Sequence, residues 1–206
     1  MSAEHYFSAE PTTAADQHTV RFTAAGRSFE LKAAGGVFSA GRLDPGTAVL
    51  LRKAPLPAAG VLLDLGCGYG PIAAVLAASV PAATVYAVDV NARAVNLVRA
   101  NAAALKLTDR LVAATPEEVP DGVRFDQIWS NPPIRIGKPA LHAMLARWLP
   151  RLAPGGTGWL VVARHLGADS LQEWLTGQDW LAGQGWSVRR YASQKGYRIL
   201  RIQAAG

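Results

Sequence analysis

The 206-residue sequence has one cysteine, Cys67. One cysteine excludes an intrachain disulfide framework and a cysteine-rich zinc site, and it favours a reducing compartment. Long hydrophobic runs are also missing, because the longest apolar tract, around VLAASVPAATVYAV, is interrupted by Pro81 and is too short to span a bilayer. The first residues, MSAEHYFSAEP, lack a basic segment followed by an apolar run, so we expect no signal peptide. We therefore expect a cytoplasmic protein without a membrane partner.

Acidic residues are scarce in the last part of the chain. Residues 127–206 carry ten Lys and Arg but three Asp and Glu, a net charge of +7, whereas residues 1–126 carry 11 and 12, a net charge of −1. A basic surface on one side favours a polyanionic partner, and nucleic acid is the commonest one. The alternative is a solvated surface. The histidines show no metal-ligand spacing, and we expect no metal site.

Strand and helix patterns alternate between residues 61 and 175. Apolar strands are expected at 61–65, 84–90, 110–115, 125–130 and 156–164, with helices at about 71–79, 92–105, 139–152 and 168–177. This alternation is typical of βαβ units, so the sequence predicts an α/β fold with a mostly parallel sheet. Two hairpins flank this region, with turns at Gly26 and Gly196. Between the first hairpin and the alternating region, Asp44 followed by Pro45 marks the start of a helix.

The stretch LDLGCGYGP (63–71) forms the first strand-to-helix turn. Its glycines, Gly66, Gly68 and Gly70, allow a tight turn and close approach of a ligand to the backbone. Asp89 ends the next strand, where a carboxylate can bind both hydroxyls of a ribose. Asp64 would repel a pyrophosphate but suits a ligand with an ammonium group. The set therefore favours S-adenosylmethionine over NAD, and the alternative is a tight packing turn.

The stretch SNPPIRIGK (130–138) follows the fourth strand. If the strand order reverses at the first strand, the fourth lies beside it, and both ends open into one crevice. The Asn131 side-chain oxygen and the Pro132 carbonyl could then hold a planar exocyclic amine and stabilise the positive charge that grows during methyl transfer. Pro132 and Pro133 have no N–H group and restrain the backbone, so they form a rigid acceptor edge. The alternative is a proline strand terminator.

The tetrapeptide NPPI resembles the [ND]-P-P-[FYW] motif of class I methyltransferases that act on planar amides and amines, with Ile134 in place of the aromatic residue. Together with HYFS, GVFSAGRLDPGT, LDLGCGYGP, AVDVNARAV, LGADSL and KGYRIL, the stretch SNPPIRIGK resembles the ribosomal RNA small-subunit (guanine-N2) methyltransferase family. The resemblance implies a Rossmann-like fold with a seven-stranded sheet, a C-terminal antiparallel hairpin and a small β-rich N-terminal cap. It also implies S-adenosylmethionine as methyl donor and guanine N2 of ribosomal RNA as acceptor.

Longer members of that family carry a second, degenerate N-terminal domain, and we expect the single-domain form here. Residues 1–206 would form one methyltransferase domain, with a cap over 1–55 and a cofactor-binding core over 56–206. Asn131, Pro132 and Pro133 are the predicted catalytic residues. The residues expected around the cofactor are Phe38, Ser39, Asp64, Gly66, Cys67, Gly68, Gly70, Asp89, Val90 and Asn131.

Ile134, Arg135 and Lys138 are the predicted RNA-binding residues, because the two cations flank the amine site and could grip phosphates beside a flipped-out nucleotide. A solubility role is the alternative for them, and it is equally open for Arg189, Arg190, Lys195, Arg198 and Arg201 on the C-terminal hairpin. Other acceptors also stay open: adenine N6, a protein glutamine or a small molecule. A different class of protein, an inert RNA-binding or ribosome-assembly module, would keep the fold without the reaction.

Overall fold

The computed structural model describes residues 17–37, 41–183 and 185–206, so the predictions for Phe38 and Ser39 lie outside the described residues. The strands are β1 (Gln17–Ala24), β2 (Arg27–Ala34), β3 (Gly60–Leu65), β4 (Ala83–Val88), β5 (Leu111–Ala114), β6 (Phe125–Ser130), β7 (Leu152–Ala163), β8 (Ser187–Gln194) and β9 (Tyr197–Gln203). The helices are α1 (Pro45–Lys53), α2 (Pro71–Ser79), α3 (Ala92–Ala104), α4 (Lys138–Trp148), α5 (Ala168–Thr176) and α6 (Asp179–Ala182).

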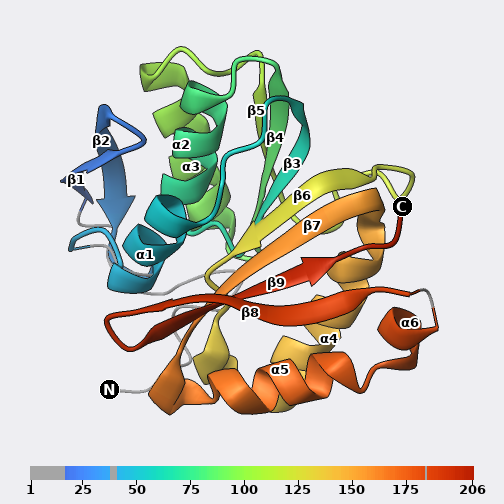
Figure 1. The fold of residues 1–206 in the computed structure, drawn as a ribbon. Coiled ribbons are helices and arrows are strands. Elements are labelled where there is room, and N and C mark those ends of the chain that lie inside the picture. The colour runs from blue at the N-terminus through green and yellow to red at the C-terminus, as the bar shows by residue number, and fades with distance from the viewer. Residues whose placement is uncertain (1–16, 38–40, 184) are drawn as a thin grey trace.

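Seven strands form one sheet in the order β5-β4-β3-β6-β7-β9-β8, while β1 and β2 pair separately (Figure 1). Strands β3 to β7 are parallel, and β9 pairs antiparallel with both β7 and β8. The strand order therefore reverses at β3, the first strand of the alternating region, which is the condition on which the expected meeting of the two motifs depends. It places the ends of β3 and β6 side by side, where a doubly wound sheet opens its ligand crevice.

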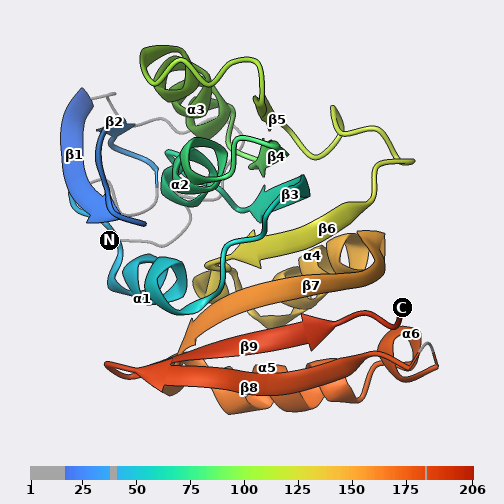
Figure 2. The same cartoon turned by 45° about the horizontal axis from the view of Figure 1, so that its top comes forward.

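Helices cover both faces of the sheet (Figure 2). Helices α1, α2 and α3 share one apolar cluster with β1 and β2, which includes Leu50, Leu76 and Val98. Helices α4 and α5 share the other cluster, which includes Leu145, Trp148 and Leu171. Coverage on both sides explains why β3 is a continuous apolar strand rather than an alternating one.

Helix starts follow the capping residues that the sequence indicates. Asp44 accepts a hydrogen bond from Thr47 N at the start of α1, and Asn91 accepts one from Arg93 N at the start of α3. The end of the helix expected at 139–152 was predicted wrongly. Helix α4 ends at Trp148 and a 3₁₀ turn follows, because Pro150 cannot continue the α-helical hydrogen-bond pattern.

The N-terminal hairpin is fastened to the sheet domain by one buried side chain. Asn101 of α3 accepts from Lys32 N at 2.8 Å and donates to Lys32 O and Tyr69 O, both at 3.0 Å. One amide thus joins β2, α3 and the glycine turn. This contact holds the hairpin against the side of the molecule that carries the crevice.

Candidate active site

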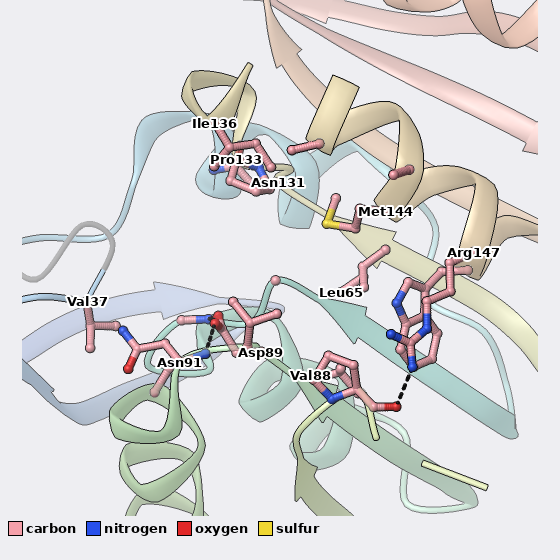
Figure 3. A pocket seen from close by; sticks show the side chains of 18 residues that line it. Val37, Leu65, Val88, Asp89, Asn91, Asn131, Pro133, Ile136, Met144 and Arg147 are labelled. Carbon is pink, nitrogen blue, oxygen red and sulfur yellow. Dashed lines mark hydrogen bonds between the residues drawn. The ribbon is translucent and has the colours of Figure 1, made fainter. Parts of the chain in front are cut away.

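A cavity of about 470 Å³ opens at the carboxyl ends of β3, β4 and β6. This volume lies within the range of about 300–1,000 Å³ that small-ligand sites occupy. Figure 3 shows Asn131, Pro133 and Ile136 on one wall, with Asp89 and Asn91 across from them. The cavity lies where strand order reverses, as the sequence predicts for a ligand site.

The glycine turn forms the floor of this cavity through Gly66 and Gly68. Gly66 has φ +72° and Gly68 has φ +56°, values that favour glycine. Gly66 N and Cys67 N both donate to Val88 O, at 2.8 and 3.1 Å, which fastens the turn to β4. Gly70, the third glycine, has φ +89° and begins α2 behind the turn instead of lining the cavity.

Asp89 presents its carboxylate to the cavity in a fixed orientation. Its Oδ2 accepts from Gly68 N and its Oδ1 from Asn91 N, both at 2.9 Å. Burial raises the pKa of Asp89, and hydrogen bonds from backbone N–H groups oppose that rise. Each oxygen keeps acceptor capacity for a ligand hydroxyl. Val90 follows with 51% of its surface exposed, which leaves an apolar side chain open beside the carboxylate.

Asp64 lies behind the turn and is 1% exposed. Its Oδ2 accepts from Ala73 N at 2.9 Å, in the first turn of α2, while its Oδ1 is buried without a hydrogen-bond partner. Burial raises the pKa of Asp64 to about 8. Asp64 is not among the residues that line the cavity, so the structure places it next to the predicted ligand site rather than in its wall.

Asn131, Pro132 and Pro133 follow the last residue of β6. Asn131 and Pro133 line the cavity, and Pro133 faces the glycine turn, because a Cβ added at Gly66 would lie 3.7 Å from Pro133 Cδ. Pro132 O accepts a hydrogen bond from Ile134 N at 2.8 Å. Pro133, at φ −74° and ψ 74°, is the central residue of this inverse γ-turn. One lone pair of the Pro132 carbonyl is therefore used within the turn, which leaves one. Pro132 itself is buried and is not among the residues that line the cavity.

The remaining predicted residues lie around this site in different ways. Ile134 and Arg135 belong to a 3₁₀ turn, and the side chains of Arg135 and Lys138 are exposed at the start of α4. Cys67 is buried, and burial raises the pKa of its thiol well above the usual range. A thiol held in its protonated form is a poor nucleophile, and Cys67 packs in the apolar cluster that α1, α2 and α3 share instead of lining the cavity.

One wall of the cavity was missed by sequence reasoning. Met144, Arg147 and Trp148 of α4 line it, and Arg147 Nη2 donates to Pro116 O at 3.1 Å across the far end (Figure 3). The sequence places α4 after the NPP motif but does not show which of its faces lines the cavity. Thr47 was missed as well, and Asp44 was identified only as a helix cap. Asn131 Nδ2 donates to Asp44 Oδ1 at 2.7 Å and to Thr47 Oγ1 at 3.1 Å.

The residues present fit S-adenosylmethionine. The Asp89 carboxylate suits a ribose, exposed Val90 and the α4 wall suit an adenine ring, and the unpartnered Asp64 oxygen suits a nearby ammonium group. In the described ranges, no three His, Cys, Asp or Glu side chains are grouped to hold a metal ion. None of the described helices is long and apolar enough to cross a membrane.

Known proteins share this sequence and architecture. The model of the methyltransferase small domain family matches residues 28–201. The uncharacterized protein YbxB of Bacillus subtilis is 34% identical over 176 residues, which cover 84% of this chain and 88% of that protein. Ribosomal RNA small subunit methyltransferase C of Pseudomonas aeruginosa is 34% identical over 151 residues, which cover 64% of this chain and 44% of that protein.

A solved structure extends the likeness to three dimensions. The 16S rRNA guanine-N2 methyltransferase of T. thermophilus, solved with AdoMet and guanosine, superimposes with a TM-score of 0.76 at 25% identity. The match covers 95% of this chain and 52% of that one. The chain therefore spans about half the length of the rRNA methyltransferases that it matches.

Proposed function

Since this chain belongs to the methyltransferase small domain family, as an S-adenosylmethionine-dependent methyltransferase of class I, we propose that it methylates the exocyclic N2 amine of a guanine in small-subunit ribosomal RNA. The observation that carries the proposal is the shared cavity. Asn131 and Pro133 line the same space as Gly66, Gly68 and Asp89, so a group held by the first pair faces a ligand held by the second set.

The cofactor supplies an electrophilic methyl group. The protein's part is to position the amine and to stabilise charge. Asn131 Oδ1 and the second lone pair of Pro132 O would each accept one N–H of the amine, which aims the nitrogen along the line of attack. As the C–N bond forms, positive charge grows on that nitrogen, and these two acceptors stabilise it. The proton is released to solvent after transfer, so the site needs no strong base.

Ribosomal RNA as the substrate is supported by two further observations. Residues 127–206 carry a net charge of +7, and exposed Arg135 and Lys138 follow the amine site directly. The relatives provide the choice of guanine N2, since the P. aeruginosa protein is named for small-subunit rRNA and the T. thermophilus structure holds guanosine. The acceptor pair alone would serve adenine N6 equally well.

Product identity tests the proposal. Purified protein and an Asn131→Ala variant would be incubated with methyl-labelled S-adenosylmethionine and unmodified small ribosomal subunits, and the digested RNA separated into nucleosides. We expect label in N2-methylguanosine. The variant should transfer about 10²–10³-fold more slowly, the usual cost of one preorganised electrostatic partner. Label in N6-methyladenosine would overturn the guanine assignment. Cofactor binding without label in RNA would overturn the RNA substrate.

A further inference from the structure

The side-chain amide of Asn131 is held in place by hydrogen bonds at its nitrogen. Both hydrogens of Nδ2 are used, one toward Asp44 Oδ1 at 2.7 Å and the other toward Thr47 Oγ1 at 3.1 Å. An ionised carboxylate has no hydrogen to donate, so the amide atom that faces Asp44 must be the nitrogen. The amide oxygen consequently points away from Asp44, which leaves it free to accept.

The two partners of Asn131 are fixed by the start of α1, more than eighty residues away in sequence. Asp44 Oδ1 also accepts from Thr47 N at 2.9 Å as the helix N-cap, and Thr47 is 3% exposed. Gly46 leaves no spare room, because a Cβ there would lie 2.9 Å from both Asp44 Oδ1 and Tyr197 Cε1. The carboxylate therefore has little freedom to leave Asn131.

We propose that Asp44 and Thr47 are positioning residues for methyl transfer, an inference that rests on the proposed function. Hydrogen bonds in a chain polarise one another. The carboxylate draws positive charge to the nitrogen end of the Asn131 amide and so increases the negative charge on its oxygen. That oxygen becomes a stronger acceptor as the substrate amine becomes cationic, which is the moment when electrostatic stabilisation accelerates transfer. Thr47 fixes the plane of the amide.

Paired substitutions separate this role from a structural one. Thr47→Val removes the acceptor while keeping the side-chain shape, and Thr47→Ser restores a hydroxyl. Asp44→Asn keeps a good N-cap but removes the charge. We expect kcat to fall about 10–100-fold in Thr47→Val and Asp44→Asn, the usual cost of losing a supporting partner. The KM for S-adenosylmethionine and the Tm should change little, and Thr47→Ser should recover most of the lost kcat.

Two results would overturn the inference while leaving the proposed function intact. If wild-type protein methylates RNA and both variants keep kcat within twofold of it, Asp44 and Thr47 do not act through Asn131. If kcat falls only in proportion to Tm, their role is structural. A wild-type protein that transfers no methyl overturns the proposed function, and the inference with it.

A second, independent observation concerns the C-terminal hairpin. Arg189 of β8 lies directly opposite Arg201 of β9, and Arg201 lies opposite Trp159 of β7, so the three side chains share one face of the sheet. Like charges directly opposite each other are destabilising. Within the described ranges neither arginine forms an ion pair with an acidic side chain. Arg201 donates a hydrogen bond to the neutral Gln203 Oε1, so the two positive charges lie opposite each other without an acidic partner among the described residues.

An exposed aromatic ring completes this face. Tyr191 is 46% exposed and packs edge-on against Trp159 at 4.9 Å between ring centroids, while Arg201 lies over the same Trp159 at 5.7 Å. Helix α5 covers the opposite side of the hairpin (Figures 1 and 2). On this side, Arg52 of α1 donates hydrogen bonds to the Gln194 side chain at the end of β8, near the hairpin turn. Exposed cations next to a ring suit a single-stranded nucleic acid, with phosphates on the arginines and a base on the tyrosine.

We infer that Arg189, Tyr191 and Arg201 bind a single-stranded segment of the substrate RNA outside the methylation site, which again rests on the proposed function. The test is the salt dependence of RNA binding. Arg189→Gln and Arg201→Gln should each lower the slope of log K against log salt by about 0.7, the value for one single-strand phosphate contact. Tyr191→Ser should weaken binding about tenfold at every salt concentration.

Arg27→Gln is the matched control, because Arg27 is an exposed arginine on the N-terminal hairpin. Slopes for Arg189→Gln and Arg201→Gln equal to that of Arg27→Gln would overturn this inference even if wild-type protein methylates RNA. Self-association that disappears in Tyr191→Ser, with RNA binding unchanged, would assign the face to a second copy of the chain instead. Wild-type protein that does not bind RNA would refute the RNA substrate itself.

Discussion

Replacing Gly70 by alanine tests how the glycine turn is built. Gly70 has φ +89°, and a Cβ there would lie 2.9 Å from Val98 Cγ2. A left-handed conformation costs an L-residue about 1–2 kcal/mol. Overpacking a filled core costs about 1–3 kcal/mol more. We therefore expect Gly70→Ala to lower the free energy of unfolding by about 2–5 kcal/mol, against typical totals of about 5–15 kcal/mol.

Gly66 and Gly122 provide the matched comparisons. Gly66 also has a positive φ, +72°, but its added Cβ would only touch Pro133 Cδ at 3.7 Å. Gly66→Ala should therefore cost only the strain of about 1–2 kcal/mol. Its methyl group would narrow the gap between the glycine turn and Pro133, so its main effect should be on ligand binding. At Gly122 a Cβ would meet nothing within 4 Å, and Gly122→Ala should change stability by less than about 1 kcal/mol.

Urea denaturation followed by tryptophan fluorescence measures these differences, with the m-value as a check that the unfolding transition is unchanged. We expect the urea concentration at the midpoint to be highest for Gly122→Ala, lower for Gly66→Ala and lowest for Gly70→Ala. Equal midpoints for the Gly70 and Gly122 variants would contradict this prediction, because they would show that the turn accommodates a side chain at Gly70.

Three more predictions concern Asp64, Asn101, and the pair Arg135 and Lys138. Burial raises the pKa of Asp64 to about 8 in the folded chain, above the unfolded value, so wild-type stability should fall as pH rises from about 4 to about 8. Asp64→Asn should flatten this slope of Tm against pH in calorimetry and weaken S-adenosylmethionine binding, and an unchanged slope would contradict the prediction. Asn101→Ala should cost about 2–4 kcal/mol in urea unfolding, since it deprives three backbone groups of buried partners; a loss below about 0.5 kcal/mol would show that the hairpin does not depend on Asn101. The double variant Arg135→Ala, Lys138→Ala should raise the KM for RNA and reduce the salt dependence of that KM, with kcat nearly unchanged. A fall in kcat alone would show that these side chains act in methyl transfer instead of in phosphate binding.

The sequence predicts the fold well where local and global signals agree. Continuous apolar strands, the glycine turn and the caps at Asp44 and Asn91 each have a short-range physical cause, and the alternation of strands and helices predicts a parallel sheet. The order of the strands was only assumed, and the structure supplies it. Given that order, the meeting of Asp89 with the NPP motif was predictable. The ends of parallel strands converge at the reversal of strand order, whatever the loops contain.

Features that depend on long-range packing could not be predicted from the sequence. The contact between Asp44 and Asn131 joins segments 87 residues apart, and each residue alone has a sufficient local explanation. The α4 wall depends on the rotation of a helix with apolar side chains on more than one face. The γ-turn bond from Ile134 N to Pro132 O is also invisible in the sequence, although it decides which lone pair of the carbonyl is free.

The most direct test of the central claim is a crystal structure of the protein with guanosine and the demethylated product of the cofactor. We expect guanine N2 to lie within hydrogen-bond distance of both Asn131 Oδ1 and Pro132 O, with Asn131 Nδ2 still bound to Asp44 and Thr47. A guanine that binds with its N2 amine away from both acceptors, or an Asn131 amide turned with its nitrogen toward the base, would contradict it.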